Sequence, residues 1–174
     1  RTKTPSRPED EGTEIVPTSR HTYSGRRVTG VAGKKNFTVI FLEKSLMNAE
    51  IGFTYRVLAV FLKHGISFEH IPTGIDTMSF VVDSAILKNG VLEEVCAEIQ
   101  ENVRPDNLRI INDIALIAVV GHGMARSVGT SARLFEAIAR AGVNVRMIDQ
   151  GSSELNIIVG VDNENYERTL KAVY

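Results

Sequence analysis

The stretch that decides the fold is residues 37–82, FTVIFLEKSLMNAEIGFTYRVLAVFLKHGISFEHIPTGIDTMSFVV, because its pattern returns 77 residues later, without a gap, in residues 114–159. Three pairs of glycines coincide under this shift: Gly52 with Gly129, Gly65 with Gly142, and Gly74 with Gly151. Glycine marks backbone positions that need a positive φ or a close approach. Shared glycines and a shared apolar pattern therefore indicate that one supersecondary unit occurs twice.

Within the first copy, the pattern predicts the order strand, helix, strand, strand, helix, strand. Apolar residues spaced i, i+4 and i+8, such as Phe53, Val57 and Phe61, predict a helix, and β-branched and aromatic runs predict strands. The elements are expected at residues 37–42, 53–64, 66–71, 77–82, 91–102 and 108–111. This order is the ferredoxin-like βαββαβ arrangement, so we expect an α+β fold with antiparallel sheets.

The second copy repeats this order but stops one strand short. Its elements are expected at residues 114–120, 130–141, 143–148 and 155–159, followed by a last helix with Asp162 as its N-cap. A missing fourth strand would leave an open sheet edge, which folded proteins avoid.

A spare strand is predicted at residues 28–32, before a turn at residues 33–36. We expect this strand to complete the sheet of the second copy. The two units, residues 37–112 and residues 113–174, would then be interleaved.

Composition excludes several classes of protein. The 174 residues carry a net charge of −1 and are 43% apolar, as in ordinary globular domains. A single cysteine, Cys96, excludes an internal disulfide framework and fits a reducing cytoplasm. Neither a membrane span nor a signal peptide is indicated, so we expect a cytoplasmic piece of a longer protein.

Residues 1–27 are rich in proline and polar residues and show no periodic apolar face, so we interpret them as a linker or the end of a neighbouring domain. Residues 1–35 hold eight Lys/Arg against four Asp/Glu. A basic arm can bind nucleic acid, but a solvated linker is the simpler interpretation. The predicted strands at residues 77–82 and 154–159 lack the stacking aromatics of RNA-binding folds.

Catalytic and metal-binding patterns are absent from the sequence. The four histidines, His21, His64, His70 and His122, have no metal-ligand spacing with the cysteine. A dinucleotide-binding fingerprint after the strand at residues 114–120 fails, because Arg126 stands where its third glycine should be.

The loop before the first helix suits a small ligand instead. A helix N-terminus offers free N–H groups to a carboxylate, and Gly52 lets the backbone approach closely. Glu69, on the next predicted strand, could neutralise a ligand ammonium group, although an ordinary surface acid is equally consistent with the pattern. The repeat places Arg146 at the equivalent position, so the two units are expected to bind unequally.

From these residues the chain resembles the regulatory region of the aspartokinase family, which is built of two ACT domains. The similarity covers nearly the whole chain, and its most specific stretches are IGF at residues 51–53, GISFE at 65–69 and IDQGSSELNI at 148–157. Residues 8–13, PEDEGT, resemble the end of the kinase catalytic domain that precedes the ACT pair.

The resemblance implies a function. Aspartokinases phosphorylate the side-chain carboxylate of aspartate with ATP and Mg²⁺, which would bind in the separate catalytic domain, so no cofactor is expected in this piece. Their ACT region binds an end-product amino acid and inhibits the kinase. It also forms a homodimer, with the effector at the interface. We expect partners of those kinds, and neither nucleic acid nor membrane.

The lysine-sensitive pattern of the family implies a specific set of effector-binding residues. These are Met47, Glu50, Gly52, Phe53, Thr54, Ser67, Phe68, Glu69 and Thr73. Glu69 replaces the family's usual Asp and keeps its charge, whereas Gly74-Ile75 replaces a Ser-Glu pair of some members. Lysine is the expected effector, with threonine, or both together, as alternatives. A competing hypothesis is an assembly subunit of a kinase complex that binds no ligand.

Overall fold

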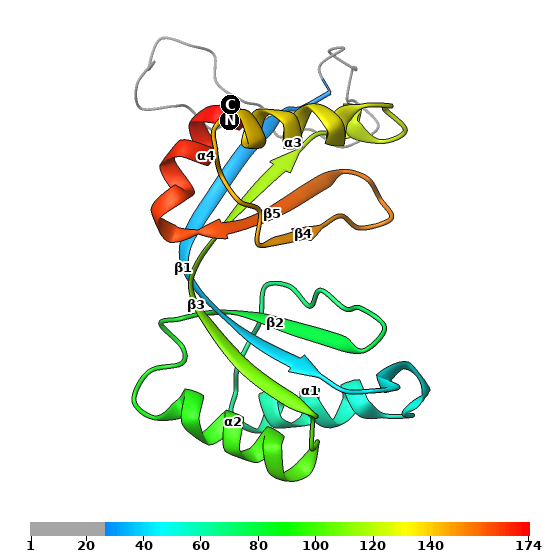
Figure 1. The fold of residues 1–174 in the computed structure, drawn as a ribbon, viewed down its shortest axis with the longest axis vertical. Helices are drawn as coiled ribbons and strands as arrows, with labels where there is room; N and C mark the ends of the chain where they lie inside the picture. Colours follow the sequence, from blue (N-terminus) through cyan, green and yellow to red (C-terminus); the bar gives the residue numbers. More distant parts are fainter. Residues whose placement is uncertain (1–26) are drawn as a thin grey trace.

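The computed structural model describes residues 27–174, which form an antiparallel five-stranded sheet with helices at both ends of the molecule (Figure 1). The strands are β1 (Gly30–Glu43), β2 (Thr77–Asp83), β3 (Asn107–Val120), β4 (Met147–Asp149) and β5 (Asn156–Asp162), in the order β2-β1-β3-β5-β4. The helices are α1 (Phe53–Lys63), α2 (Val91–Asn102), α3 (Thr130–Arg140) and α4 (Tyr166–Val173). The predicted α+β fold with antiparallel strands is confirmed.

Three short 3-10 helices connect these elements: η2 (Met47–Ala49), η3 (His122–Met124) and η4 (Asn163–Asn165). Residues 1–26 lie outside the described residues. The predicted linker, apart from Arg27, and the PEDEGT stretch at residues 8–13 therefore lie there too.

The two long strands β1 and β3 run through both units. The first half of β1 pairs with β3 from Gly30↔Val120 to Lys34↔Leu116, and its second half pairs with β2 and with the start of β3. Residues 30–32 therefore lie in the same sheet as β5 and β4, which is the pairing that interleaved units require.

The predicted turn at residues 33–36 is wrong, and so is the break between the strands at 108–111 and 114–120. In each place the structure has one continuous strand. The chain bends through register shifts between Lys34 and Val39, and through positive φ angles at Asn36 (68°) and Asp113 (60°), instead of turning. These two residues are equivalent under the 77-residue shift, so the repeat extends to the bends. Short polar residues tolerate this left-handed conformation best.

Each unit has its own core between its helices and its half of the sheet. In the first unit, α1 and α2 bury residues such as Val57 and Ile99 against Ile40 and Phe80. In the second, α3 and α4 pack against the inner side chains of β3 and β5. Burial of one such side chain stabilises the fold by about 1.5–3 kcal/mol.

A third apolar cluster lies between the two halves, on the sheet faces that no helix covers. Its buried members are Phe37, Val39, Val81, Ile114, Leu116 and Ile158. We call it the interunit cluster. It packs the two units together where β1 and β3 cross from one to the other (Figure 1).

Of two predicted edge strands, one does not form and the other is shorter than expected. Residues 66–71 form no regular strand: the edge segment, which we define as residues 66–73, makes only isolated bridges to β2, His70↔Val81 and Thr73↔Met78. Pro72 has no backbone N–H to donate, which limits regular pairing there. The strand predicted at 143–148 is reduced to β4, Met147–Asp149.

Asp162 is not the N-cap of the last helix. It precedes η4, makes no capping hydrogen bond, and instead accepts a hydrogen bond from Arg146, Nη1 to Oδ1 at 3.2 Å. The residue before α4 is Asn165, whose carbonyl accepts a hydrogen bond from Thr169 Oγ1 at 2.8 Å.

Candidate functional site

The loop between β1 and α1 leaves the start of the helix open. Gly52 precedes the helix with φ 82°, a left-handed conformation that suits glycine, and it has no side chain to cap the helix. The Gly52 carbonyl accepts a hydrogen bond from the Arg56 N–H at 3.0 Å. No side chain caps α1 at Gly52, and the Phe53 N–H donates to the Glu50 carbonyl at 3.2 Å.

The side chains predicted at this loop have different surroundings. Met47 and Phe53 are buried in the core of the first unit, so they support the loop rather than face a ligand. Glu50 is half-buried and forms an ion pair with Arg56, whose guanidinium also lies 6.0 Å from the Phe53 ring centroid. Thr54 is exposed on the first turn. The surface offered to a ligand is thus Gly52 backbone, Thr54 and the Glu50–Arg56 pair.

The edge segment carries the other candidates. Ser67 and Glu69 are exposed, and Phe68 packs its ring edge-on against Phe61 and Phe80 at centroid distances of 6.1 and 5.8 Å. The Glu69 N–H donates to the Val81 carbonyl at 2.8 Å, which fixes the segment against β2.

Glu69 and Thr73 line two different cavities. Glu69 lines one of about 240 Å³ together with Lys34 and His70. Thr73 lines another of about 420 Å³ between the units, and its hydroxyl donates to the Ile71 carbonyl at 3.1 Å. The nine predicted residues therefore occupy separate places on one chain: the start of α1, and two ends of the edge segment.

Lys34 stands between Glu69 and another acid. Lys34 Nζ lies 2.8 Å from Asp83 Oδ2, and this hydrogen bond raises the pKa of Lys34. The charge of Glu69 also raises the pKa of Lys34, which places the two side chains near each other. The same bond from Lys34, followed by a hydrogen bond from the Ala85 N–H, lowers the pKa of the Asp83 carboxyl.

One contact between the units was missed from the sequence. His70 Nδ1, in the edge segment, lies 3.0 Å from Asp149 Oδ2 at the end of β4. From the sequence, His70 had no metal-ligand spacing and no assigned partner. Because His70 and Asp149 are 79 positions apart, no local sequence pattern indicates that they pair, although Asp149 belongs to the distinctive stretch at 148–157. The contact joins the segment that carries Glu69 to the second unit.

The described part of the chain offers little for other chemistry. Among residues 27–174, no group of three or more His, Cys, Asp or Glu side chains is arranged to hold a metal ion. Within the same residues, the helices are too short or too polar to cross a membrane. Cys96 is half-buried, and this burial raises the pKa of its thiol, which makes it a poor nucleophile.

Comparison with known proteins agrees with the fold. The family model for the ACT domain matches residues 117–174. The chain is 36% identical over 172 residues to aspartokinase 3 of Bacillus subtilis, which covers 99% of this chain and 37% of that protein. The fold and the family match define an ACT-domain protein.

Solved structures agree with the sequence comparison. Aspartate kinase of Clostridium acetobutylicum, described as an allosteric enzyme, superposes with a TM-score of 0.91 and 42% identity over 97% of this chain and 39% of that one. The regulatory subunit of aspartate kinase from Thermus flavus gives a TM-score of 0.71 and 25% identity, covering 85% of this chain and 97% of that one. The chain is therefore homologous to the C-terminal ACT regulatory region of aspartokinases. It spans little more than a third of the length of the Bacillus relative.

Proposed function

We propose that this chain is the allosteric regulatory part of a cytoplasmic aspartokinase. It binds an end-product amino acid and thereby inhibits the ATP- and Mg²⁺-dependent phosphorylation of aspartate by a catalytic domain outside this sequence. Two interleaved ACT units, residues 37–112 and 113–174 with residues 28–32, carry this role. The observation that carries the proposal is the uncapped start of α1 at Gly52, on a chain homologous over 99% of its length to an aspartokinase.

Lysine is the effector that these residues fit best. The first-turn N–H groups of α1 and the positive end of its dipole suit a carboxylate. The exposed carboxylate of Glu69 suits an ammonium group, and it lines a small cavity that also has Lys34, His70 and apolar side chains in its walls. Threonine has no second ammonium group, so it would use the helix start without needing Glu69.

The two parts of this site lie apart on one chain, and we propose that a second copy joins them. In a homodimer, the open helix start of one protomer would face the edge segment of its partner. Four large apolar side chains in the first unit are exposed near these elements: Leu46, Ile51, Tyr55 and Ile75. Ile51 is 97% exposed and Tyr55 is 74% exposed, an arrangement that a partner surface would cover.

Inhibition then follows from the contact between the units. An effector held at Glu69 would shift the edge segment, and the His70–Asp149 pair would pass that shift to β4 of the second unit. An effector changes an equilibrium only by its difference in affinity for the two states, typically about 1–3 kcal/mol. We propose that the second unit in turn moves against the catalytic domain.

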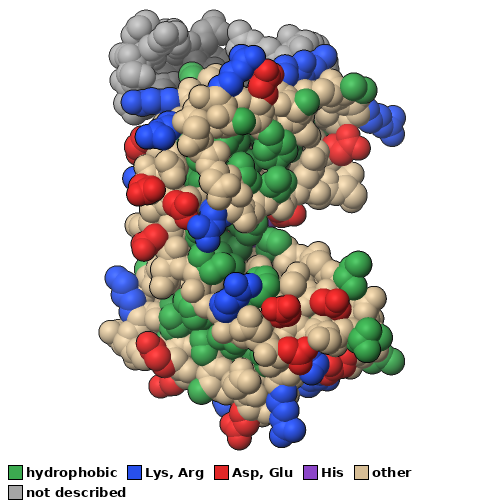
Figure 2. Space-filling model, in the orientation of Figure 1, with side chains coloured by type: hydrophobic (Ala, Val, Ile, Leu, Met, Phe, Trp, Pro, Cys, Tyr) green, Lys and Arg blue, Asp and Glu red, His purple; other side chains and the backbone are tan. Residues whose placement is uncertain are grey.

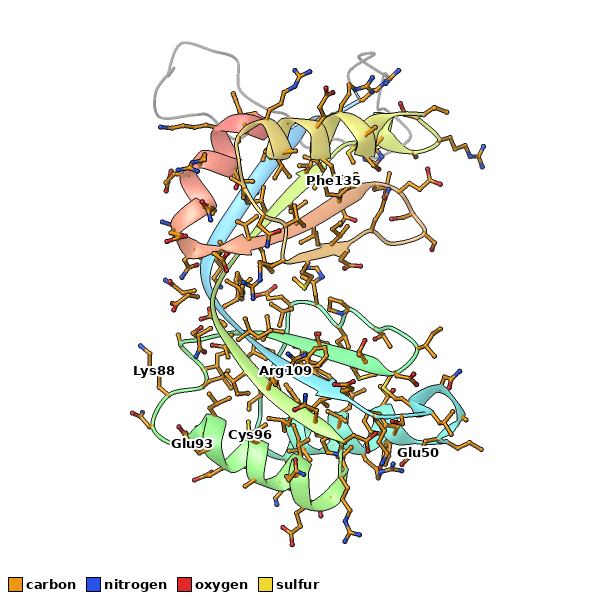
Figure 3. All side chains as sticks on the ribbon, viewed as in Figure 1. Glu50, Lys88, Glu93, Cys96, Arg109 and Phe135 are labelled. Atoms are coloured by element: carbon orange, nitrogen blue, oxygen red, sulfur yellow. The ribbon has the colours of Figure 1, made fainter. Side chains whose placement is uncertain are left out.

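Isothermal calorimetry with lysine and threonine tests the assignment. Glu69→Ala should weaken lysine binding about tenfold or more, because a hydrogen bond to a charged group contributes roughly 1.5–3 kcal/mol. Threonine binding should change little. Glu93→Ala is the matched control, since Glu93 is exposed on α2, on the opposite side of the first unit from Glu50 (Figure 3). Equal losses for lysine and threonine would remove Glu69 from the site.

A second candidate is an assembly subunit that binds no ligand. The observation that favours it is the likeness to the regulatory subunit from Thermus flavus, which is a chain of its own almost fully covered by this one. Such a subunit would bind a catalytic chain and show no heat of binding with any amino acid. Calorimetry therefore separates the two candidates.

A further inference from the structure

The repeat creates two equivalent cavities between the units. The smaller one, of about 240 Å³, is lined by Ala32 and Glu69, and the larger one, of about 420 Å³, by their equivalents Arg109 and Arg146. Further lining pairs obey the same 77-residue shift: Phe37 with Ile114, Leu116 with Val39, and Ala118 with Phe41. The two cavities are thus copies of one site, placed on either side of the interunit cluster.

The charges of the two copies differ. Glu69 gives the smaller cavity a carboxylate, although Lys34 lies beside it. The larger cavity, which we call the basic cavity, has two guanidinium groups and no acidic side chain in its lining. The two copies therefore differ in charge: the smaller cavity balances an acid with a lysine, whereas the basic cavity has only cationic side chains among its charged lining residues.

The basic cavity draws its walls from both units. Arg109 and Phe41 come from the strands of the first unit, while Arg146 and Met147 come from the second. Figure 2 shows a hollow between the halves of the molecule with hydrophobic, basic and acidic side chains near it, and Figure 3 places Arg109 over the strands of the first unit. A ligand here would touch both units at once.

Both arginines are held in place while keeping donors available. The Arg109 guanidinium lies over the Phe41 ring, 4.5 Å from its centroid, and the residue is exposed. Across residues 27–174, no carboxylate lies within ion-pair distance of Arg109. Arg146 uses Nη1 for Asp162 and has further N–H donors on its planar fork.

We propose that the basic cavity is a ligand site for a small organic carboxylate with an apolar body. Arg109 and Arg146 hold the carboxylate, because guanidinium forks match carboxylate geometry and form charge-assisted hydrogen bonds. The apolar body lies on Val39 and Ile114, at the margin of the interunit cluster. The volume of the basic cavity is within the usual range for small-molecule sites.

This site is independent of the effector role proposed for Glu69. It requires an acid on the ligand but no amine, since its lining has no carboxylate to receive one. A ligand that bridges Arg109 and Arg146 ties the two units together across the bends at Asn36 and Asp113. Its binding therefore stabilises one angle between the units.

A matched pair of probes tests the proposal on the whole chain. We expect 4-methylpentanoate to give saturable binding in calorimetry, and 4-methylpentanamide, with the same apolar body and no charge, to bind about tenfold more weakly or worse. Arg109→Gln and Arg146→Gln should each weaken 4-methylpentanoate by about tenfold. Arg168→Gln, at an exposed position of α4, should leave it within about twofold.

Three results would overturn the site. The first is the absence of saturable 4-methylpentanoate binding at about 10 mM, a concentration at which even a millimolar dissociation constant is visible. The second is equal affinity for the acid and the amide. The third is a loss of affinity in the Arg168→Gln control as large as in the Arg109→Gln and Arg146→Gln variants. Urea denaturation of each variant shows whether it is folded as the parent is. Because lysine binding is measured separately, failure here leaves the effector proposal standing, and failure of that proposal leaves this one.

Discussion

Truncation of Ile114 to alanine should destabilise both units at once. Ile114 is 2% exposed, belongs to the interunit cluster, and lies in β3 opposite Phe37 of β1 and Asp162 of β5. Its Cγ2 lies 3.7 Å from the position that a Cβ on Gly160 would take. The side chain therefore touches strands of both units.

The magnitude follows from what the truncation removes. Three buried carbon groups at about 0.8 kcal/mol each give roughly 2.4 kcal/mol, and the cavity left behind raises the loss to about 3 kcal/mol. For a chain of this length, that loss lowers the melting temperature by roughly 6–12 °C. Because β1 and β3 run through both units, we expect one cooperative transition that shifts as a whole.

Urea denaturation monitored by far-UV circular dichroism, together with scanning calorimetry, measures this loss of stability. Val128→Ala is the control, since Val128 is 93% exposed and should change stability by less than about 0.5 kcal/mol. Two separate transitions, with only one shifted by Ile114→Ala, would refute the coupling of the units through the long strands. A loss in Val128→Ala as large as in Ile114→Ala would refute the burial argument.

Two further predictions concern the first unit. Gly52→Ala should lower the free energy of unfolding by about 1 kcal/mol in urea denaturation, because φ is 82° at this position. Gly151→Ala should leave it unchanged, because no atom lies within 4 Å of the new Cβ. Equal effects of the two substitutions would contradict the backbone argument. Hydrogen bonds, chiefly from Lys63 and then from His64, lower the pKa of the Glu98 carboxyl. The stability that Glu98 contributes is therefore present above the ordinary carboxyl pKa and is lost as pH falls below about 4. Glu98→Gln should flatten that loss of stability between pH 7 and pH 3, and an unchanged slope would exclude Glu98 as its source.

Much of the architecture was predictable because the repeat is written into the apolar pattern. The helix at residues 91–102 was predicted at the bounds the structure has, since its apolar stripe and the preceding glycine leave one solution. The bends in β1 and β3 could not be predicted in the same way. Polar residues at positions 34–36 are typical of a turn. The chain stays extended there through contacts with distant segments: Lys34 pairs with Leu116 of β3, and Asn36 forms hydrogen bonds with Ser84 and Asn163.

The candidate site was predictable in part. The repeat marked Gly52 and Gly129 as equivalent, and in the structure both precede a helix with nearly the same φ, 82° and 83°. The burial of Phe53 agrees with its place on the apolar face of the predicted helix. The burial of Met47, by contrast, depends on how the loop folds back onto the core, which no spacing rule contains. The separation of Glu69 from Thr73 into different cavities depends on how the second unit packs against the edge segment, as does the His70–Asp149 contact.

In the structure, Glu69 and Arg146 line two separate cavities between the units. The two residues are equivalent in the repeat, and they line equivalent cavities on either side of the interunit cluster. One cavity carries an acid beside Lys34, and the other carries two arginines. The difference between the units is therefore a difference in the charge of one shared site, on a common framework of strands.

The central claim is that the first unit senses an amino acid, and a thermal shift measured with a panel of the twenty amino acids tests it most directly. At a lysine concentration about 100 times its dissociation constant, binding adds about 2.7 kcal/mol, which corresponds to a rise of roughly 5–10 °C in melting temperature. We predict that rise for lysine in the parent chain and its loss in Glu69→Ala. A panel in which no amino acid raises the melting temperature would contradict the account.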